Sequence, residues 1–128
     1  MKILGIGVDI IENKRICSLV NKKSFIERTF GKKEIKLSKK YTNKTSYFAK
    51  RFAAKEAFAK SLGTGFRNNL SFKGIEILND KIGKPYYCLS NETYKILNKK
   101  FKVKKFDLFL SISDEKDYSV AFTILQIK

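Results

Sequence analysis

The segment from Thr45 to Leu62 constrains the fold most, because apolar and small side chains point in nearly every direction around its helical period. Such a helix has no continuous polar face, so we expect it to be central and largely buried. The residues of this pattern are Tyr47, Phe48, Ala49, Phe52, Ala53, Ala54, Ala57, Phe58, Ala59 and Leu62. Gly63 is well placed for a left-handed helix end, and a loop, Gly63-Thr64-Gly65, follows.

Shorter patterns on either side predict strands and surface helices. Residues 3–11 form an apolar run rich in Ile, which favours a buried strand. Asn13 can cap the next segment, an amphipathic helix whose apolar stripe contains Ile16, Leu19 and Val20. Strands followed by helices and then mostly strands indicate an α+β fold. The other expected elements are a short helix at 33–39, strands at 71–78 and 86–89, a helix at 91–99, and a hairpin of strands 108–113 and 118–125.

Length and composition bound the class of protein. With 128 residues and 43% hydrophobic content, we expect one compact domain, residues 1–128. The net charge of +16 attracts phosphorylated ligands, acidic proteins and nucleic acid alike, and a Lys-rich compositional bias also explains part of it. The apolar N-terminal run is broken by Asp9 and is far shorter than the ~20 residues of a membrane span. We therefore expect a cytoplasmic protein without a membrane segment.

The chain contains no His, which removes the commonest general base and every His-dependent triad. Its two cysteines, Cys17 and Cys88, have no metal-ligand spacing. Carboxylates, Lys and metal-bound water therefore remain as the groups that can run a reaction.

Asp9 lies inside the apolar run of the first strand, where an unpaired carboxylate costs several kcal/mol. A partner is therefore required. Two interpretations are open: Asp9 caps the turn after the strand, as Asp often does, or it is a metal ligand.

Four charged residues interrupt the apolar helix, and at least some must meet one another or a charged ligand. They are Arg51, Lys55, Glu56 and Lys60. By themselves, Glu56 and Lys60 are an ordinary helix pair worth ~0.3 kcal/mol. Together with Asp9, however, they match the carboxylates that Mg²⁺ prefers beside substrate phosphates, with a Lys to neutralise the attacked phosphate. These residues alone leave both interpretations open, an ordinary helix pair and a magnesium site.

Four blocks of sequence, in order, resemble the holo-acyl-carrier-protein synthases, a family of 4′-phosphopantetheinyl transferases. Residues 5–12 (GIGVDIIE) and 51–65 (RFAAKEAFAKSLGTG) look like its two signature motifs. The resemblance extends to residues 83–85 (GKP) and to 110–121, and so covers essentially the whole chain. It implies the phosphopantetheinyl transferase fold, an antiparallel sheet packed against a long central helix. It also implies a Mg²⁺-dependent enzyme of fatty-acid biosynthesis.

By this resemblance, the enzyme transfers 4′-phosphopantetheine from coenzyme A to a serine of apo acyl-carrier protein and releases 3′,5′-ADP. Asp9 and Glu56 would hold Mg²⁺, and Lys60 would stabilise the phosphate. Glu56, or a metal-bound water that it orients, would take the serine proton. The residues implied in coenzyme binding are Arg51, Lys60, Gly63, Thr64, Gly65, Lys84 and Pro85.

The resemblance further implies a homotrimer with active sites between subunits, in which Arg51 or Ser113-Asp114 completes a neighbour's site. Many members have His where Asp114 stands; because a carboxylate cannot face a phosphate as a cation, we leave Asp114 out of the predicted site. Lys14, Arg15 and Lys22 look like the docking surface for the acidic carrier protein. A merely solvated helix face is the alternative.

Two rival functions share some of these features. A small nucleic-acid-binding module would carry a similar charge, although most Phe residues occupy apolar-periodic positions and no single-strand-binding or groove-reading motif is present. A metal-dependent nuclease or phosphatase would share the paired carboxylates but would hydrolyse its substrate without a carrier protein. We expect neither nucleic acid nor a membrane as a partner.

Overall fold

The computed structural model of the chain describes residues 1–67 and 69–127. The predicted α+β order, with antiparallel strands and one long helix, is confirmed. The elements in chain order are β1 (Lys2–Glu12), α1 (Asn13–Cys17), α2 (Lys23–Thr29), α3 (Lys32–Ser38), α4 (Lys44–Ser61), the 3-10 turn η1 (Phe72–Gly74), β2 (Ile75–Asn79), β3 (Pro85–Leu89), α5 (Asn91–Phe101), β4 (Phe106–Asp114) and β5 (Tyr118–Ile127).

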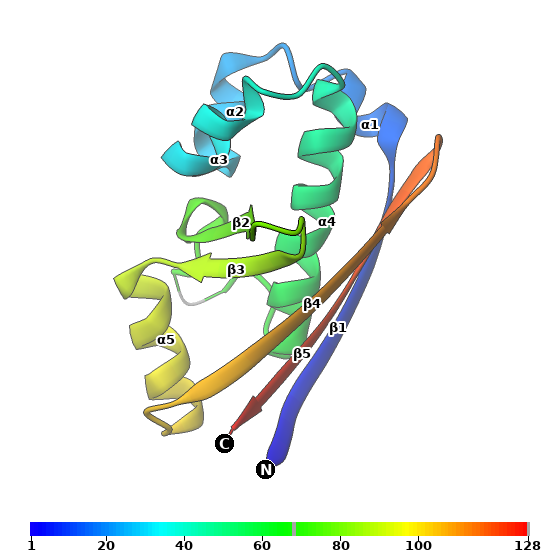
Figure 1. Ribbon diagram of the computed structural model, residues 1–128. Helices are drawn as coiled ribbons and strands as arrows, with labels where there is room; N and C mark the ends of the chain where they lie inside the picture. The colour runs from blue at the N-terminus through cyan, green and yellow to red at the C-terminus, as the bar shows by residue number, and fades with distance from the viewer. Residues whose placement is uncertain (68, 128) are drawn as a thin grey trace.

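Helix α4 lies at the centre of the molecule (Figure 1). On one side, β1, β5 and β4 form an antiparallel sheet in that spatial order, and β1 and β5 pack along the helix. The antiparallel hairpin β2–β3 lies on the other side, between the short helices α2 and α3 and the C-terminal helix α5. The two ends of the chain are adjacent, because Lys2 pairs with Ile127.

The burial of α4 follows the sequence pattern. Ala49, Ala53, Ala57 and Phe58 are fully buried, which confirms the predicted central helix. Gly63 has φ of +81°, and it ends the helix in the left-handed conformation that was predicted. The small side chains allow neighbouring elements to approach the helix backbone closely.

The segment after β1 differs from the predicted helix. Helix α1 ends at Cys17, and Leu19 and Val20 pack against the core from a turn. Asn13 is the first helical residue rather than the cap, and its side-chain amide donates to the carbonyl oxygens of Glu115 and Lys116. The prediction of an Asn13 cap is therefore wrong. Its side chain instead ties the start of α1 to the turn between β4 and β5.

Two further boundaries differ from the sequence pattern. The predicted strand at 71–78 begins only at Ile75, because Phe72–Gly74 form a 3-10 turn. The segment Lys23–Thr29 forms α2, a helix that was not among the elements expected from the sequence. The predicted C-terminal hairpin is confirmed, with Asp114 paired to Ser119.

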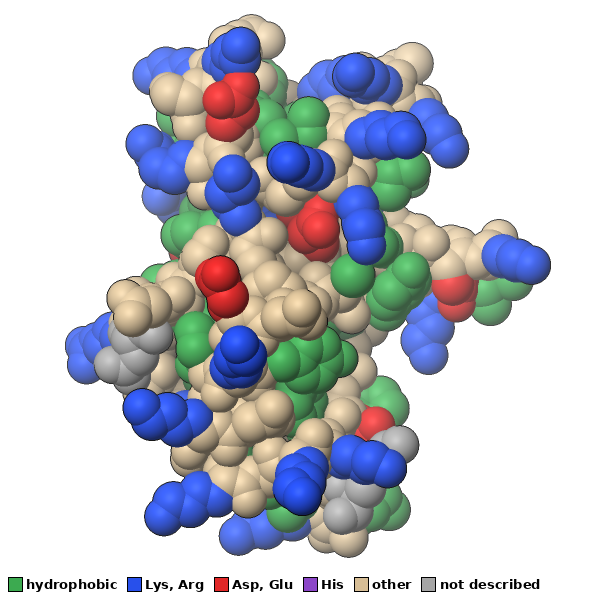
Figure 2. Space-filling model, turned by 90° about the vertical axis from the view of Figure 1, so that its left-hand side faces the viewer, with side chains coloured by type: hydrophobic (Ala, Val, Ile, Leu, Met, Phe, Trp, Pro, Cys, Tyr) green, Lys and Arg blue, Asp and Glu red, His purple; other side chains and the backbone are tan. Residues whose placement is uncertain are grey.

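Positive charge covers much of the surface. Figure 2 shows Lys and Arg side chains scattered over the face formed by α2, α3, the β2–β3 hairpin and α5, rather than gathered into one stripe. Both Cys17 and Cys88 are free thiols. No helix within residues 1–67 and 69–127 has the length and hydrophobicity to cross a membrane.

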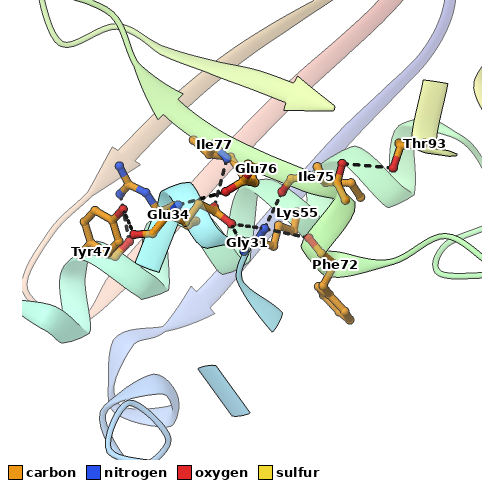
Figure 3. Close-up of polar contacts among 11 residues, drawn as sticks. Gly31, Glu34, Tyr47, Lys55, Phe72, Ile75, Glu76, Ile77 and Thr93 are labelled. Atoms are coloured by element: carbon orange, nitrogen blue, oxygen red, sulfur yellow. Dashed lines mark hydrogen bonds and ion pairs between the residues drawn. The ribbon is translucent and has the colours of Figure 1, made fainter. Parts of the chain in front are cut away.

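A fully buried ion pair joins α3 to α4 (Figure 3). Lys55 Nζ lies 2.7 Å from Glu34 Oε1, and it also donates to the carbonyl oxygens of Phe72 and Ile75. Glu34 accepts two more hydrogen bonds, from the backbone N–H groups of Gly31 and Ile77. Burial raises the pKa of the Glu34 carboxyl, and Lys55 opposes that shift. Lys55 is therefore a structural residue of α4, and Glu34 is the partner that the sequence pattern missed.

Replacement of Lys55 by Met is expected to destabilise the protein by about 3–5 kcal/mol, because it leaves Glu34 buried without a cation. Urea denaturation followed by circular dichroism measures the free energy of unfolding. Lys36→Met, on the exposed side of α3, is the control and should change this energy by less than about 0.5 kcal/mol. Adding Glu34→Gln to Lys55→Met should recover part of the loss. A Lys55→Met variant as stable as the control would contradict the explanation.

Candidate active site where β1 crosses α4

Two glycines allow β1 to touch the backbone of α4. A Cβ atom on Gly5 would lie 1.8 Å from the carbonyl oxygen of Ser61, and one on Gly7 would lie 1.9 Å from that of Ala57. No other residue type fits either position without moving the strand. Because side chains alternate along a strand, Asp9 shares the face of Gly5 and Gly7 and also points toward α4.

A small charged cluster forms where Asp9 meets the helix. Lys60 Nζ lies 3.0 Å from Asp9 Oδ1 and 3.0 Å from the carbonyl oxygen of Val8. Glu56 is half-buried one turn before Lys60. Partial burial and the nearby Asp9 raise the pKa of the Glu56 carboxyl, while Lys60 and Arg15 oppose the shift. Two carboxylates and at least one cation therefore share this site.

This geometry excludes one of the two interpretations of Asp9 that the sequence left open. Asp9 pairs with Ala121 in mid-strand, three residues before the end of β1, so it does not cap the turn after the strand. Among the residues described, the ion pair of Lys60 is with Asp9 rather than along α4 with Glu56. Lys60 is 54% exposed, and such a pair contributes at most about 1 kcal/mol.

The donor set at this site fits Mg²⁺. No group of three or more His, Cys, Asp or Glu residues suited to a metal exists in the described part of the chain. Mg²⁺ needs no such cage, since it is usually held by one or two carboxylates, with water and substrate phosphate in the other positions. The mutual repulsion of Asp9 and Glu56 is what a divalent cation would relieve.

Two predicted coenzyme-binding residues, Arg51 and Pro85, line a cavity of about 150 Å³ on the hairpin side of α4. Arg51 is buried there, with its guanidinium 3.6 Å from the centre of the Tyr47 ring and Nη2 2.7 Å from Asn79 Oδ1. Its Nε atom is buried and has no hydrogen-bond partner in the described structure. The other residues that line the cavity are Tyr41, Lys50, Ile77, Gly83, Ile112 and Asp114.

The structure thus places the predicted site residues in separate groups rather than in one. Arg51 and Glu56 are five residues apart, about 140° around the helix, so they face different sides of α4. Pro85 lies with Arg51, while the exposed Lys84 donates its backbone N–H to Asp80 beside that cavity. Asp114 lines the Arg51 cavity although it was left out of the predicted site.

The loop Gly63-Thr64-Gly65 lies at the C-terminal end of α4, about 18 Å along the helix from Arg51. Gly65 also has a positive φ, of +64°. Thr64 lines an open hollow together with basic side chains, namely Arg67, Lys95, Lys99 and Lys100.

The predicted docking residues Lys14 and Arg15 are exposed on α1. Arg15 is close enough to Glu56 to lower the pKa of that carboxyl, so this basic surface borders the charged cluster. Lys22 is exposed at the start of α2.

The outer face of the three-stranded sheet is apolar, and its large side chains are exposed within the part of the chain that the structure describes. Because β1 alternates, Ile6, Val8 and Ile10 point away from α4, and they are 60%, 53% and 62% exposed. Phe122 on β5 and Phe109 on β4 extend this patch. A contiguous apolar surface of this kind is typical of an interaction site.

Known proteins match this fold and sequence over nearly the whole chain. Residues 5–123 match the family model of the 4′-phosphopantetheinyl transferase superfamily. A holo-[acyl-carrier-protein] synthase of Pelagibacter ubique is 59% identical over 128 residues, which is all of both chains. The crystal structure of the synthase from Neisseria meningitidis has a TM-score of 0.87 and 37% identity, covering 97% of this chain and 98% of that one. The synthase from Bacillus anthracis, in complex with CoA (3′,5′-ADP), has a TM-score of 0.82 and 36% identity, covering all of both chains.

The fold and sequence therefore define a phosphopantetheinyl transferase: the chain belongs to the 4′-phosphopantetheinyl transferase superfamily. Its similar relatives within that superfamily are holo-acyl-carrier-protein synthases, which confirms the resemblance drawn from the motifs. The predicted family fold and the prediction of an enzyme are confirmed with it.

Gly7→Ala is expected to destabilise the protein by about 1–3 kcal/mol, because the new methyl group overlaps the carbonyl oxygen of Ala57. Equilibrium unfolding in guanidinium chloride checks this. The control is Ser111→Ala on an exposed position of β4, which should be nearly neutral. Equal stability of the two variants would show that β1 does not need this close approach.

Proposed function

We propose that the chain is one phosphopantetheinyl transferase domain, residues 1–128, that moves the 4′-phosphopantetheine group of coenzyme A to a serine of apo acyl-carrier protein. The observation that carries this proposal is the meeting of Asp9, Glu56 and Lys60 where β1 crosses α4. The names of the relatives support the carrier substrate, and the Bacillus anthracis complex supports the coenzyme. On this proposal the reaction releases 3′,5′-ADP and serves fatty-acid biosynthesis in the cytoplasm.

Asp9 and Glu56 are the residues that would hold Mg²⁺, the cofactor of the proposed reaction. When bound, the ion supplies positive charge to the pyrophosphate of coenzyme A. Lys60 adds a second cation on the same side, and its exposed side chain is free to turn from Asp9 to a phosphate oxygen. The site therefore concentrates positive charge where the leaving group forms.

Glu56 accepts the proton of the attacking serine hydroxyl. It lies beside Asp9 and Lys60 and is only half-buried, so it remains partly accessible to that hydroxyl group from the surface. The serine oxygen forms a bond to the β-phosphorus while the bond to the bridging oxygen breaks. That oxygen keeps the bonding electrons and leaves with 3′,5′-ADP.

The nucleotide end of coenzyme A is assigned to the remaining predicted residues. The unpartnered Nε of Arg51 supports this, because a buried guanidinium N–H without an acceptor favours an anionic ligand. Lys84 and Pro85 belong to the adjoining turn. Gly63, Thr64 and Gly65 form the loop at the end of α4, where the Gly63 N–H donates to the carbonyl oxygen of Lys60 and Thr64 lines a hollow with basic side chains.

These residues require more than one chain, because Arg51 and the carboxylates lie on different sides of α4. We propose a homotrimer in which Arg51 of one subunit completes the site formed by Asp9 and Glu56 of its neighbour. The uncovered apolar face, with Val8 and Phe122 exposed, supports burial against another copy.

The carrier protein is assigned to the basic surface that borders the carboxylates. Lys14 and Arg15 on α1, with Lys22 beyond it, complement an acidic partner and lie beside the site where its serine must react. This placement favours docking over the alternative of a merely solvated face.

Incubation with apo acyl-carrier protein, coenzyme A and Mg²⁺ is expected to raise the carrier mass by ~340 Da, the mass of the transferred arm, because Asp9 and Glu56 complete the metal-dependent site. Mass spectrometry of the carrier measures this gain. EDTA and Asp9→Ala should each abolish it, whereas Lys36→Met should not. No gain with any carrier, from a folded protein that binds random oligonucleotides with steep salt dependence, would favour the nucleic-acid-binding alternative.

Variants that damage opposite halves of the site should rescue each other if the sites lie between subunits. Arg51→Ala and Glu56→Gln, each inactive alone, are expected to regain about a quarter of wild-type transferase activity when refolded together, since random assembly joins intact halves in about that share of sites. A mixture of Asp9→Ala and Glu56→Gln, both damaged in the same half, is the control. Activity no greater than in this control would contradict shared sites.

A further inference from the structure

Asn79, the last residue of β2, connects Arg51 to the turn that follows the strand. Its Oδ1 atom accepts from Arg51 Nη2 at 2.7 Å, and its Nδ2 atom donates to the carbonyl oxygen of Gly83 at 3.0 Å. The exposed amide of Asn79 therefore accepts a hydrogen bond from α4 and donates one to the turn after β2.

The guanidinium of Arg51 is held from two other directions by Tyr47. The Tyr47 ring supports its face at 3.6 Å, and the Tyr47 carbonyl oxygen accepts from Nη1 at 3.1 Å. The phenol group of Tyr47 is itself fixed, since it donates to the carbonyl oxygen of Glu34. Both contacts come from Tyr47 on α4, the helix that also carries Arg51. Asn79 is therefore the contact that sets the position of the guanidinium relative to the β2–β3 hairpin.

The turn on the other side of Asn79 is well ordered by hydrogen bonds. Asp80 Oδ1 accepts from the N–H groups of Ile82 and Lys84, and the Asp80 N–H donates to the carbonyl oxygen of Lys84. Gly83 and Pro85 line the same cavity as Arg51. A displacement of this turn would therefore move Gly83 and Pro85 together and change the shape of the cavity.

We propose that Asn79 is a positioning residue that holds the Arg51 guanidinium in register with the Gly83-Lys84-Pro85 turn and so sets the affinity for the anionic end of the coenzyme. This inference rests on the proposed function, which assigns coenzyme A to that cavity. A neutral amide suits the role, because it orients Arg51 without neutralising the charge that attracts a phosphate. An Asp at this position would bind the guanidinium as an ion pair and weaken its attraction for an anion.

Isothermal titration of the assembled protein with coenzyme A tests this role in a double-mutant cycle. Asn79→Ala is expected to weaken coenzyme A binding about 10-fold, the usual effect of losing one hydrogen bond to a charged group. In an Arg51→Ala background the same substitution should have an effect of less than about 2-fold, because the residue it positions is gone. Asn79→Asp should also weaken binding, although it keeps an acceptor for Arg51. The KM for the carrier protein should stay unchanged in all Asn79 variants.

Asp80→Ala is the matched control, since it loosens the same turn without touching Arg51. Its loss of affinity should persist in the Arg51→Ala background, whereas that of Asn79→Ala should not. Wild-type affinity in Asn79→Ala, or equal losses with and without Arg51, would overturn the positioning role alone. Wild-type affinity in Arg51→Ala would instead overturn the coenzyme site of the proposed function and this inference with it.

Discussion

The contact of β1 with the backbone of α4 is the constraint on which the rest of the structure depends. Gly5 and Gly7 place the strand against the carbonyl oxygens of Ser61 and Ala57, where even a methyl group does not fit. This approach is possible only because the facing side of α4 is built from small residues. Alternation along β1 then turns Asp9 toward the helix and Ile6, Val8 and Ile10 away from it. The acidic site and the apolar outer face are therefore consequences of the same two glycines.

The charged residues of α4 divide between a structural role and the proposed catalytic role according to the side of the helix on which they lie. Lys55 is fully buried and satisfied by Glu34 and two carbonyl oxygens, so it has no capacity left for a ligand. Glu56, the next residue, is turned about 100° away and faces Asp9. The buried ion pair of Lys55 with Glu34 fixes the rotation of α4 about its axis. A buried pair of this kind adds little net stability, but it specifies one arrangement of α3, α4 and β2.

The sequence predicted the parts of this fold that depend on local pattern. Helix α4, its Gly63 end and the C-terminal hairpin follow from periodicity and turn residues, which act over a few positions. The partner of Lys55 did not follow, because Glu34 is 21 residues away and only tertiary packing brings it near. Its one local signal is the spacing Gly31-x-x-Glu34, in which the Glu34 carboxylate accepts from the Gly31 N–H as in a capping box. Asn13 and Asn79 were missed or misread for the same reason, since their hydrogen bonds are to residues whose positions the fold determines.

On the proposed function, the separation of the predicted site residues makes catalysis depend on assembly. Asp9 and Glu56 face the sheet side of α4, while Arg51 is held between Tyr47 and Asn79 on the hairpin side, with the body of the helix between them. One coenzyme molecule cannot follow a straight path from one group to the other through that helix. On the proposed function, a complete site therefore needs the Arg51 side of a second copy to face the carboxylates. The apolar face of β1 lies directly behind Asp9 on the same strand, so burying that face brings a second copy close to the acidic residues. Association would then bury the apolar face of the sheet, which stabilises it, and would bring Arg51 of the second copy to the carboxylates.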